Sequence, residues 1–207
     1  MRQRIRYNVR RKCFVKINLL KEVYWIMKLN EYIFLIGFMG CGKSTNARYL
    51  SKMTGAEQME MDQKIVEMQG MAISDIFAKH GEAYFRDLET ELIRSMKEKV
   101  PMVVSCGGGA VLREENVALM KARGKIVLLT ASPESIYDRV KHSTDRPLLN
   151  GNMNVEYISE LMEKRRPKYE AAADIVISTE MKNVREICEE ILEKMERLRV
   201  RAERHAK

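Results

Sequence analysis

The feature that most constrains this chain is a glycine-rich segment directly after a short apolar run, YIFLIGFMGCGKST at residues 32–45. Gly37, Gly42, Lys43 and Ser44 match the pattern G-x-x-x-x-G-K-[ST], in which backbone N–H groups surround phosphate oxygens. The apolar run predicts a strand buried on both faces, and the residues after the glycines predict a helix whose N-terminus faces an anion. Because both flanks fit, we favour a phosphate-binding P-loop over a chance glycine-rich turn.

Two side chains of this motif carry specific chemistry. Lys43 supplies a positive charge for the β- and γ-phosphates of a nucleotide, and Ser44 supplies a hydroxyl ligand for Mg²⁺. The motif therefore predicts binding of a nucleotide with its Mg²⁺, and leaves open whether a second substrate accepts a phosphoryl group.

Predicted strands and helices alternate along the whole chain. The strands are expected at residues 32–38, 57–61, 102–106, 125–131 and 175–178. Helices are expected over 43–53, from about 62, over 74–79, from 81, over 114–123 with a stop at Gly124, from 133, and over 155–172 and 183–204. This alternation is typical of an α/β protein with three layers, in which about five parallel strands carry the site at their carboxyl ends.

Positive charge is concentrated at the N-terminus. Residues 1–28 contain nine of the 37 Lys and Arg residues and one of the 29 Asp and Glu residues, so this segment accounts for the whole net charge of +8. The remainder is neutral, which argues against a nucleic-acid-binding protein. We expect residues 1–27 to be a dispensable basic extension or a misassigned start, with an arm for nucleic acid or acidic membrane as the alternative. Residues 28–207 are then one functional domain.

Cysteine and histidine spacing gives no sign of a disulfide framework or a metal cluster. No C-x-x-C pair occurs among Cys13, Cys41, Cys106 and Cys188, which is typical of reduced thiols in a cytoplasmic protein. The three histidines are interpreted as solvated, and no apolar run is long enough to span a bilayer.

Three further segments stand out. The three glycines at 107–109 follow a predicted strand and indicate close approach of the backbone to a ligand, with a tight turn as the alternative. Arg86 and Glu89 share one helix face, where the simplest interpretation is a surface ion pair. Residues 142–154 are polar, lie between two predicted helices and suit a lid. Asp62, taken alone, would be a helix N-cap.

In this order, the segments resemble one family, the shikimate kinases, which belong to the nucleoside-monophosphate-kinase-like group of P-loop enzymes. GFMGCGKST resembles the family's P-loop, EMDQKI its D-x-D segment, GEAYFRDLE its G-E-x-x-F-R-x-x-E helix and VVSCGGGAVL its triple-glycine strand end. DRPLL resembles its lid, and RRPKYEAAAD resembles its R-x-P-x-Y-x-x-x-A-D helix. The resemblance covers residues 28 to about 195. It implies ATP-dependent, Mg²⁺-requiring phosphorylation of the 3-hydroxyl of shikimate, a step toward chorismate and the aromatic amino acids.

The resemblance also implies a nucleotide site. Arg139 would lie against adenine, and Arg146 would close over the γ-phosphate from a lid at about 142–154. Ser44 would bind Mg²⁺ directly and Glu60 through water. The phosphates of ATP would be held by the P-loop residues Gly40, Cys41, Gly42, Lys43, Ser44 and Thr45.

For the acceptor, the resemblance implies that Arg86 and Arg165, helped by Gly108, bind the carboxylate of shikimate. Asp62 would meet the reacting hydroxyl, which makes Lys43, Asp62 and Arg146 the catalytic residues. Spacing to the following proline and tyrosine favours Arg165 over its neighbour Arg166.

Two positions depart from the family pattern. Glu60 replaces the first aspartate of D-x-D, and Cys106 stands where a threonine is common, with no role expected for it. The remaining alternatives are a related kinase for gluconate or a nucleoside monophosphate, and a nucleotide-binding module without catalysis. We expect shikimate and ATP as the only partners, without nucleic acid or membrane, in a cytoplasmic monomer.

Overall fold

The computed structural model describes residue 29 and residues 31–97, 100–141 and 153–205. The basic segment 1–27 lies outside the described residues, as do residues 142–152 of the lid predicted at about 142–154, including Arg146.

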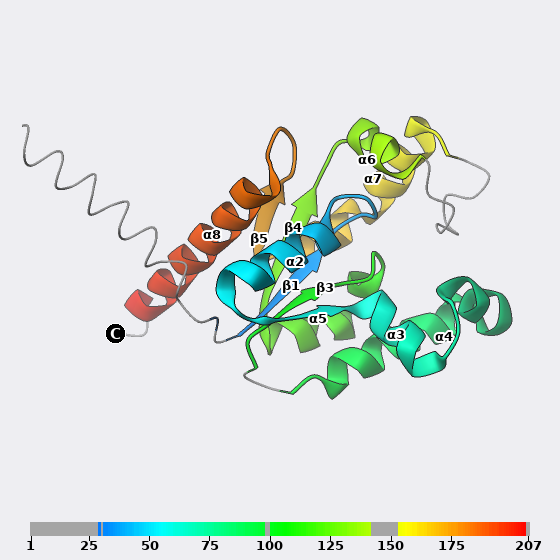
Figure 1. Ribbon diagram of the computed structural model, residues 1–207, viewed down its shortest axis with the longest axis horizontal. Helices are drawn as coiled ribbons and strands as arrows, with labels where there is room; N and C mark the ends of the chain where they lie inside the picture. Colours follow the sequence, from blue (N-terminus) through cyan, green and yellow to red (C-terminus); the bar gives the residue numbers. More distant parts are fainter. Residues whose placement is uncertain (1–28, 30, 98–99, 142–152, 206–207) are drawn as a thin grey trace, which may run out of the picture.

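Five parallel strands form one sheet in the order β2-β3-β1-β4-β5 (Figure 1). Strand β1, which leads into the P-loop, lies at the centre between β3 and β4. The predicted three-layer α/β fold with about five parallel strands is confirmed. The strands are β1 (Tyr32–Ile36), β2 (Glu57–Glu60), β3 (Met102–Ser105), β4 (Gly124–Thr130) and β5 (Ile175–Ser178).

Two helical layers cover the sheet. Within the described residues the helices are α2 (Lys43–Thr54), α3 (Met61–Gln69), α4 (Ile73–Ser95), η1 (Ala110–Leu112), α5 (Glu114–Lys121), α6 (Pro133–Val140), α7 (Val155–Ala172) and α8 (Val184–His205). Tyr32, Phe34 and Ile36 of β1 pack with residues of α3, α4 and α5, whereas Ile33 and Leu35 pack with residues of α2, α6 and α8. Side chains alternate along a strand, so the continuous apolar run of β1 fills both cores.

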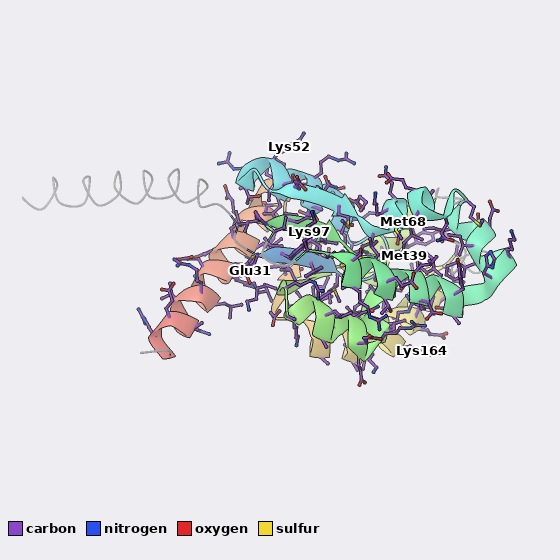
Figure 2. The ribbon with its side chains drawn as sticks, turned by 90° about the horizontal axis from the view of Figure 1, so that it is seen from below. Glu31, Met39, Lys52, Met68, Lys97 and Lys164 are labelled. Carbon is purple, nitrogen blue, oxygen red and sulfur yellow. The ribbon has the colours of Figure 1, made fainter. Side chains whose placement is uncertain are left out.

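The helices that flank the site lie at opposite ends of the molecule. Helix α8 extends along one end of the longest axis, and α3 and α4 project at the other end (Figures 1 and 2). The P-loop lies between these two ends, because it follows the central strand. Among the described residues, no helix is both long and apolar enough to cross a membrane.

Side-chain caps begin α6 and α8. Ser132 Oγ accepts a hydrogen bond from the Ser135 N–H at 3.1 Å, directly before Pro133 at the first helical position. For α8, Asn183 Oδ1 accepts from the Glu186 N–H at 3.0 Å, while Glu186 Oε2 accepts from the Asn183 N–H at 2.8 Å. This reciprocal pair is a capping box. The predicted bounds of α7 and β5 are confirmed without change.

Two local predictions are wrong. Gly124 does not end a helix: α5 ends at Lys121, and Gly124 is the first residue of β4, where a Cβ would lie 2.0 Å from the Tyr32 carbonyl oxygen. Asp62 is not an N-cap, because it lies inside the first turn of α3, after Glu60 at the cap position. The prediction of two helices around Gly81 is confirmed, because α4 consists of two helices joined across a kink at this residue, where the backbone is non-helical with φ 83°.

Core packing of α2 gives a stability prediction. Leu50 is fully buried between α2 and the sheet, so Leu50→Ala removes three carbon atoms and leaves a cavity. We expect the free energy of unfolding in urea to fall by about 2–5 kcal/mol. Met181→Ala is the control, since this side chain is 100% exposed and its removal should change stability by less than about 0.5 kcal/mol. Equal effects of the two substitutions would contradict the packing described here.

Candidate active site

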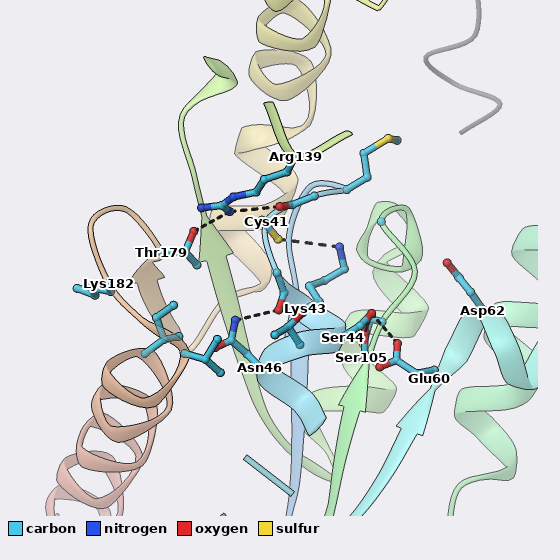
Figure 3. Close-up of a pocket in the computed structure, with 18 residues that line it drawn as sticks. Cys41, Lys43, Ser44, Asn46, Glu60, Asp62, Ser105, Arg139, Thr179 and Lys182 are labelled. Atoms are coloured by element: carbon cyan, nitrogen blue, oxygen red, sulfur yellow. Dashed lines mark hydrogen bonds between the residues drawn. The ribbon is translucent and has the colours of Figure 1, made fainter. Parts of the chain in front are cut away.

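A pocket of about 500 Å³ lies at the carboxyl edge of the sheet, over the P-loop. Arg139, Thr179 and Lys182 line it on one side, and Glu60 and Asp62 lie on the other (Figure 3). These side chains come from the ends of different strands and helices, as expected for a site in an open parallel sheet.

The P-loop is closed around its own lysine. Lys43 Nζ donates hydrogen bonds to the carbonyl oxygens of Gly37, at 2.9 Å, and Phe38, at 3.0 Å. Gly37 has φ 135°, and a Cβ at this position would lie 2.3 Å from the Leu129 carbonyl oxygen of β4. Only glycine fits where the loop packs against β4. The two hydrogen bonds to the loop carbonyls hold the Lys43 ammonium group close to the N-terminus of α2.

Arg139 joins the P-loop to the end of β5. Its Nη1 donates to the Gly40 carbonyl oxygen at 3.2 Å and to Thr179 Oγ1 at 3.3 Å. Thr179 is buried and its hydroxyl donates in turn to the Thr130 carbonyl oxygen at 3.1 Å. The guanidinium plane is therefore fixed on the side of the pocket that faces α8.

Sequence reasoning missed several residues that line this pocket: Asn46, Ser105, Thr179, Lys182, Val184 and Ile187. Ser105 and Thr179 lie at the ends of β3 and β5, so the rule that strand ends carry the site could have identified them. Val184 and Ile187 had no local signal, because their place at the pocket depends on how α8 packs against α2.

Oxygen atoms gather at the start of α2. Ser44 Oγ donates to Glu60 Oε2 at 2.9 Å and lies 3.3 Å from Ser105 Oγ (Figure 3). Hydroxyl and carboxylate oxygens suit Mg²⁺, so the donor set fits the cation that the motif implies. Across the described residues there is no group of three or more His, Cys, Asp or Glu side chains that could hold a metal ion.

Arg86 is not part of a surface ion pair. Its side chain is 9% exposed and the Glu89 side chain is fully buried, with Arg86 Nη1 donating to Glu89 Oε2 at 2.6 Å. Arg86 Nε and Nη2 both donate to Glu82 Oε1, at 3.1 and 2.8 Å. The interpretation as an ordinary surface pair is wrong, because the turn after β3 covers this part of α4.

The three glycines of the turn after β3 have different surroundings, so a side chain would be excluded at only two of the three positions. A Cβ on Gly109 would lie 2.3 Å from the Arg86 guanidinium carbon, and a Cβ on Gly107 would lie 2.5 Å from Glu89 Oε1 and 2.8 Å from Asp62 Oδ1. Gly108 has no such contact and lines the pocket instead. The backbone does approach something closely, as predicted, but at two of the three positions it approaches the protein's own side chains.

Arg165 and Arg166 point to different surroundings. The Arg165 guanidinium carbon lies 5.9 Å from the centre of the Phe38 ring, next to the P-loop. Arg166 is exposed and pairs with Glu163 along α7. Tyr169 is buried and donates a hydrogen bond to the Gly108 carbonyl oxygen. Burial raises the pKa of Tyr169 to about 12, so its hydroxyl stays protonated and able to donate.

The structure brings most predicted site residues into one place. The pocket is lined by Gly40, Cys41, Gly42, Lys43, Ser44, Thr45, Glu60, Asp62, Gly108 and Arg139. Arg86 and Arg165 do not line it; they contact residues beside it, Gly109 and Phe38. Cys106, for which no role was predicted, also lines the pocket, and its burial raises the pKa of its thiol.

Comparison with known proteins gives a consistent result. A sequence profile of the family described as "Shikimate kinase" matches residues 39–196. A protein named "Shikimate kinase" from Thermodesulfovibrio yellowstonii is 43% identical over 166 residues, which is 80% of this chain and 95% of the relative. The structure of shikimate kinase from Acinetobacter baumannii in complex with shikimate is 30% identical, covers 83% of this chain and 94% of its own, and has a TM-score of 0.74. Shikimate kinase from Aquifex aeolicus is 38% identical with a TM-score of 0.67, covering 80% of this chain and 96% of its own.

The buried Glu89 predicts a pH dependence of stability. Glu89 Oε1 has no hydrogen-bond partner among the described residues, and burial raises the pKa of Glu89 to about 7, although Arg86 opposes the shift. In the unfolded chain the pKa of a glutamate is about 4.3. Between these values the folded state binds more protons, so the free energy of unfolding decreases as pH rises.

Glu89→Gln should remove this component. From about pH 4.5 to 7.5 we expect wild type to lose at least about 1 kcal/mol of stability relative to Glu89→Gln, the equivalent of one pKa unit. Urea unfolding at a series of pH values measures the difference. Glu82→Gln is the matched control, because Glu82 also bonds Arg86 but its side chain is 53% exposed. Parallel pH curves for wild type and Glu89→Gln would show that the carboxyl group has no raised pKa.

Proposed function

The chain belongs to the shikimate kinase family and transfers a phosphoryl group from ATP to shikimate, and we propose that three groups of side chains divide this work. One group holds the phosphates, a second holds Mg²⁺ and a third holds the acceptor. The observation that carries the proposal is that the pocket over the P-loop is also lined by Asp62 and Gly108, the two residues that we assign to the acceptor.

We assign the acceptor to the space beside Gly108. Arg86 lies against Gly109 of the glycine turn, and Arg165 lies beside Phe38 of the P-loop. Two guanidinium groups can bind a carboxylate through charge-assisted hydrogen bonds. Glu82 now bonds Arg86 through one carboxylate oxygen, and its half-exposed side chain can leave. The substrate carboxylate would take the place of Glu82, while the buried Glu89 keeps the guanidinium in position.

For the transfer itself, Asp62 would orient the 3-hydroxyl and accept its proton. Asp62 is exposed in the first turn of α3, with its carboxylate toward the glycine turn. Lys43 would neutralise charge on the transferring phosphoryl group, joined by Arg146 of the lid, which lies outside the described residues. Positioning and charge stabilisation are the main requirements of phosphoryl transfer, and closure over the pocket would exclude water.

The remaining residues would hold the nucleotide and its metal. Arg139 would lie against adenine, and the P-loop from Gly40 to Thr45 would hold the phosphates. Ser44 would bind Mg²⁺ directly, and Glu60 would orient one of its water ligands. When bound, Mg²⁺ supplies charge neutralisation between the phosphates.

We further propose that residues 28–207 suffice for this activity, and that the protein works as a monomer in the cytoplasm. The support is the position of the family match, which begins at residue 39, and the neutral charge of the chain beyond the basic segment.

An assay of ADP release tests the proposal directly. The full chain and residues 28–207 are each supplied with ATP and Mg²⁺, and with shikimate, gluconate or a nucleoside monophosphate in separate reactions. We expect turnover with shikimate alone, equal in the two proteins and abolished when the metal is chelated. Turnover with another acceptor, or activity without metal, would overturn the corresponding part of the proposal.

A matched pair of arginines tests the acceptor site. Arg165→Ala should lower kcat/KM for shikimate by about 100-fold or more, because a charge-assisted contact to the carboxylate is lost. The dissociation constant of ADP, measured by calorimetry, should stay within about twofold. Arg166→Ala removes the neighbouring guanidinium, which is exposed and paired with Glu163, and should change neither quantity. If both substitutions lower kcat/KM equally, the assignment to Arg165 is wrong.

A further inference from the structure

Both oxygens of the Glu60 carboxylate are held by side chains of this protein. Ser44 Oγ donates to Oε2 at 2.9 Å, and Gln58 Nε2 donates to Oε1 at 2.8 Å. Ser105 Oγ, 3.3 Å from Ser44 Oγ, continues this row of hydrogen-bonding groups. Gln58 belongs to none of the motifs described above and does not line the pocket, so its contact with the carboxylate needs its own explanation.

The pairing register of β2 and β3 brings the side chains of this row together. Gln58 and Glu60 are two residues apart in β2, so their side chains share one face of the strand. Met59 between them packs into the opposite core, against the α3 and α4 side. Glu60 pairs with Ser105 of the neighbouring strand β3, at the edge where α2 begins. The row therefore follows from the geometry of the two strands.

The direction of the hydrogen bonds matters for a cation. Ser44 donates its one hydroxyl hydrogen bond to Glu60, so Ser105 is the donor in the contact between the two hydroxyl groups, and one lone pair of the Ser44 oxygen is left to bind a metal ion. The Glu60 carboxylate must keep its orientation in order to accept this hydrogen bond. The Glu60 side chain has one more rotatable bond than the aspartate found in the D-x-D pattern, and fixing it costs additional conformational entropy. The bond from Gln58 holds the longer side chain in the orientation that Ser44 needs.

We propose that Gln58 is a positioning residue for Mg²⁺ binding, and that it compensates for glutamate at position 60. This inference rests on the proposed roles of Ser44 and Glu60 toward the metal. Gln58 acts through Glu60 and touches neither the cation nor the nucleotide. Outer hydrogen-bond partners of this kind commonly change metal affinity by about 10–100-fold.

Metal binding can be measured without turnover. Mn²⁺, a paramagnetic substitute for Mg²⁺, is titrated into the full chain with saturating ADP, and free Mn²⁺ is followed by electron paramagnetic resonance. Gln58→Leu removes the donor and keeps a similar volume. We expect it to weaken Mn²⁺ binding by about tenfold or more, while the affinity for ADP without metal stays within about twofold.

The same substitution in a Glu60→Asp background separates positioning from general damage. Aspartate has one fewer torsion to fix, so in this background Gln58→Leu should change Mn²⁺ affinity by less than about twofold. Equal losses in both backgrounds would show that Gln58 supports the strand and not the glutamate. Unchanged Mn²⁺ affinity in the single variant would likewise overturn the inference.

Two further comparisons complete the test. Gln63→Leu is the matched control, since Gln63 Nε2 also donates to a carboxylate, Glu67 Oε1 at 3.3 Å, on the exposed face of α3. It should leave Mn²⁺ affinity unchanged. If wild type with ADP binds no Mn²⁺, the proposed metal site fails and this inference fails with it. If wild type binds Mn²⁺ and Gln58→Leu binds it equally well, only the inference on Gln58 fails.

Discussion

The burial of β1 on both faces is the constraint on which the rest of the structure depends. All five of its residues are buried, and they alternate between two separate cores. A strand in this position needs a helical layer on each side, and its backbone groups need a parallel neighbour on each edge. The carboxyl end of β1 is then the centre of one edge of the sheet. The P-loop follows at this point, so the phosphate site lies where the ends of β2, β3 and β5 can contribute side chains.

The side of the sheet covered by α4 carries an ionic contact that is costly to bury. Arg86 and Glu89 are both removed from water, and the glycine turn after β3 packs directly on them. Such a pair is weak evidence for stability, because desolvation offsets much of the attraction. The ion pair instead fixes the position of the Arg86 guanidinium, because the buried Glu89 carboxylate stays in contact with it. The turn, the ion pair and Asp62 thus form one unit, in which a change at Gly107 or Gly109 displaces charged groups of the site.

The parts of this fold that could be predicted from sequence are those whose signals are local. The P-loop, the start of α6 at Ser132, and the bounds of α7 and β5 depend on residues within a few positions of one another. The burial of Arg86 could not be predicted in this way, because it depends on a turn about twenty residues later in the chain. Gly124 was misinterpreted for a similar reason, because it packs against the backbone of β1, which is distant in the sequence. Glycine is favoured both at the end of a helix and at the start of a strand that has no room for a side chain, so the residue type alone does not distinguish the two. Gln58 gave no signal, since its role depends on the alternation of an edge strand.

If Arg86 binds the acceptor carboxylate as proposed, its contact with Glu82 makes acceptor binding an exchange of one carboxylate for another. A tethered side chain competes for the guanidinium as an internal ligand, with an effective concentration set by one turn of helix α4. The binding free energy of an external carboxylate is then only the difference between its own contact with Arg86 and the Glu82–Arg86 contact that it replaces. Binding is weaker as a result, but carboxylates are distinguished more strongly from neutral molecules. A neutral molecule of the same shape offers nothing in return for displacing Glu82, and it would meet a guanidinium that is already occupied. In the proposed site, helix α4 would therefore select for anionic acceptors.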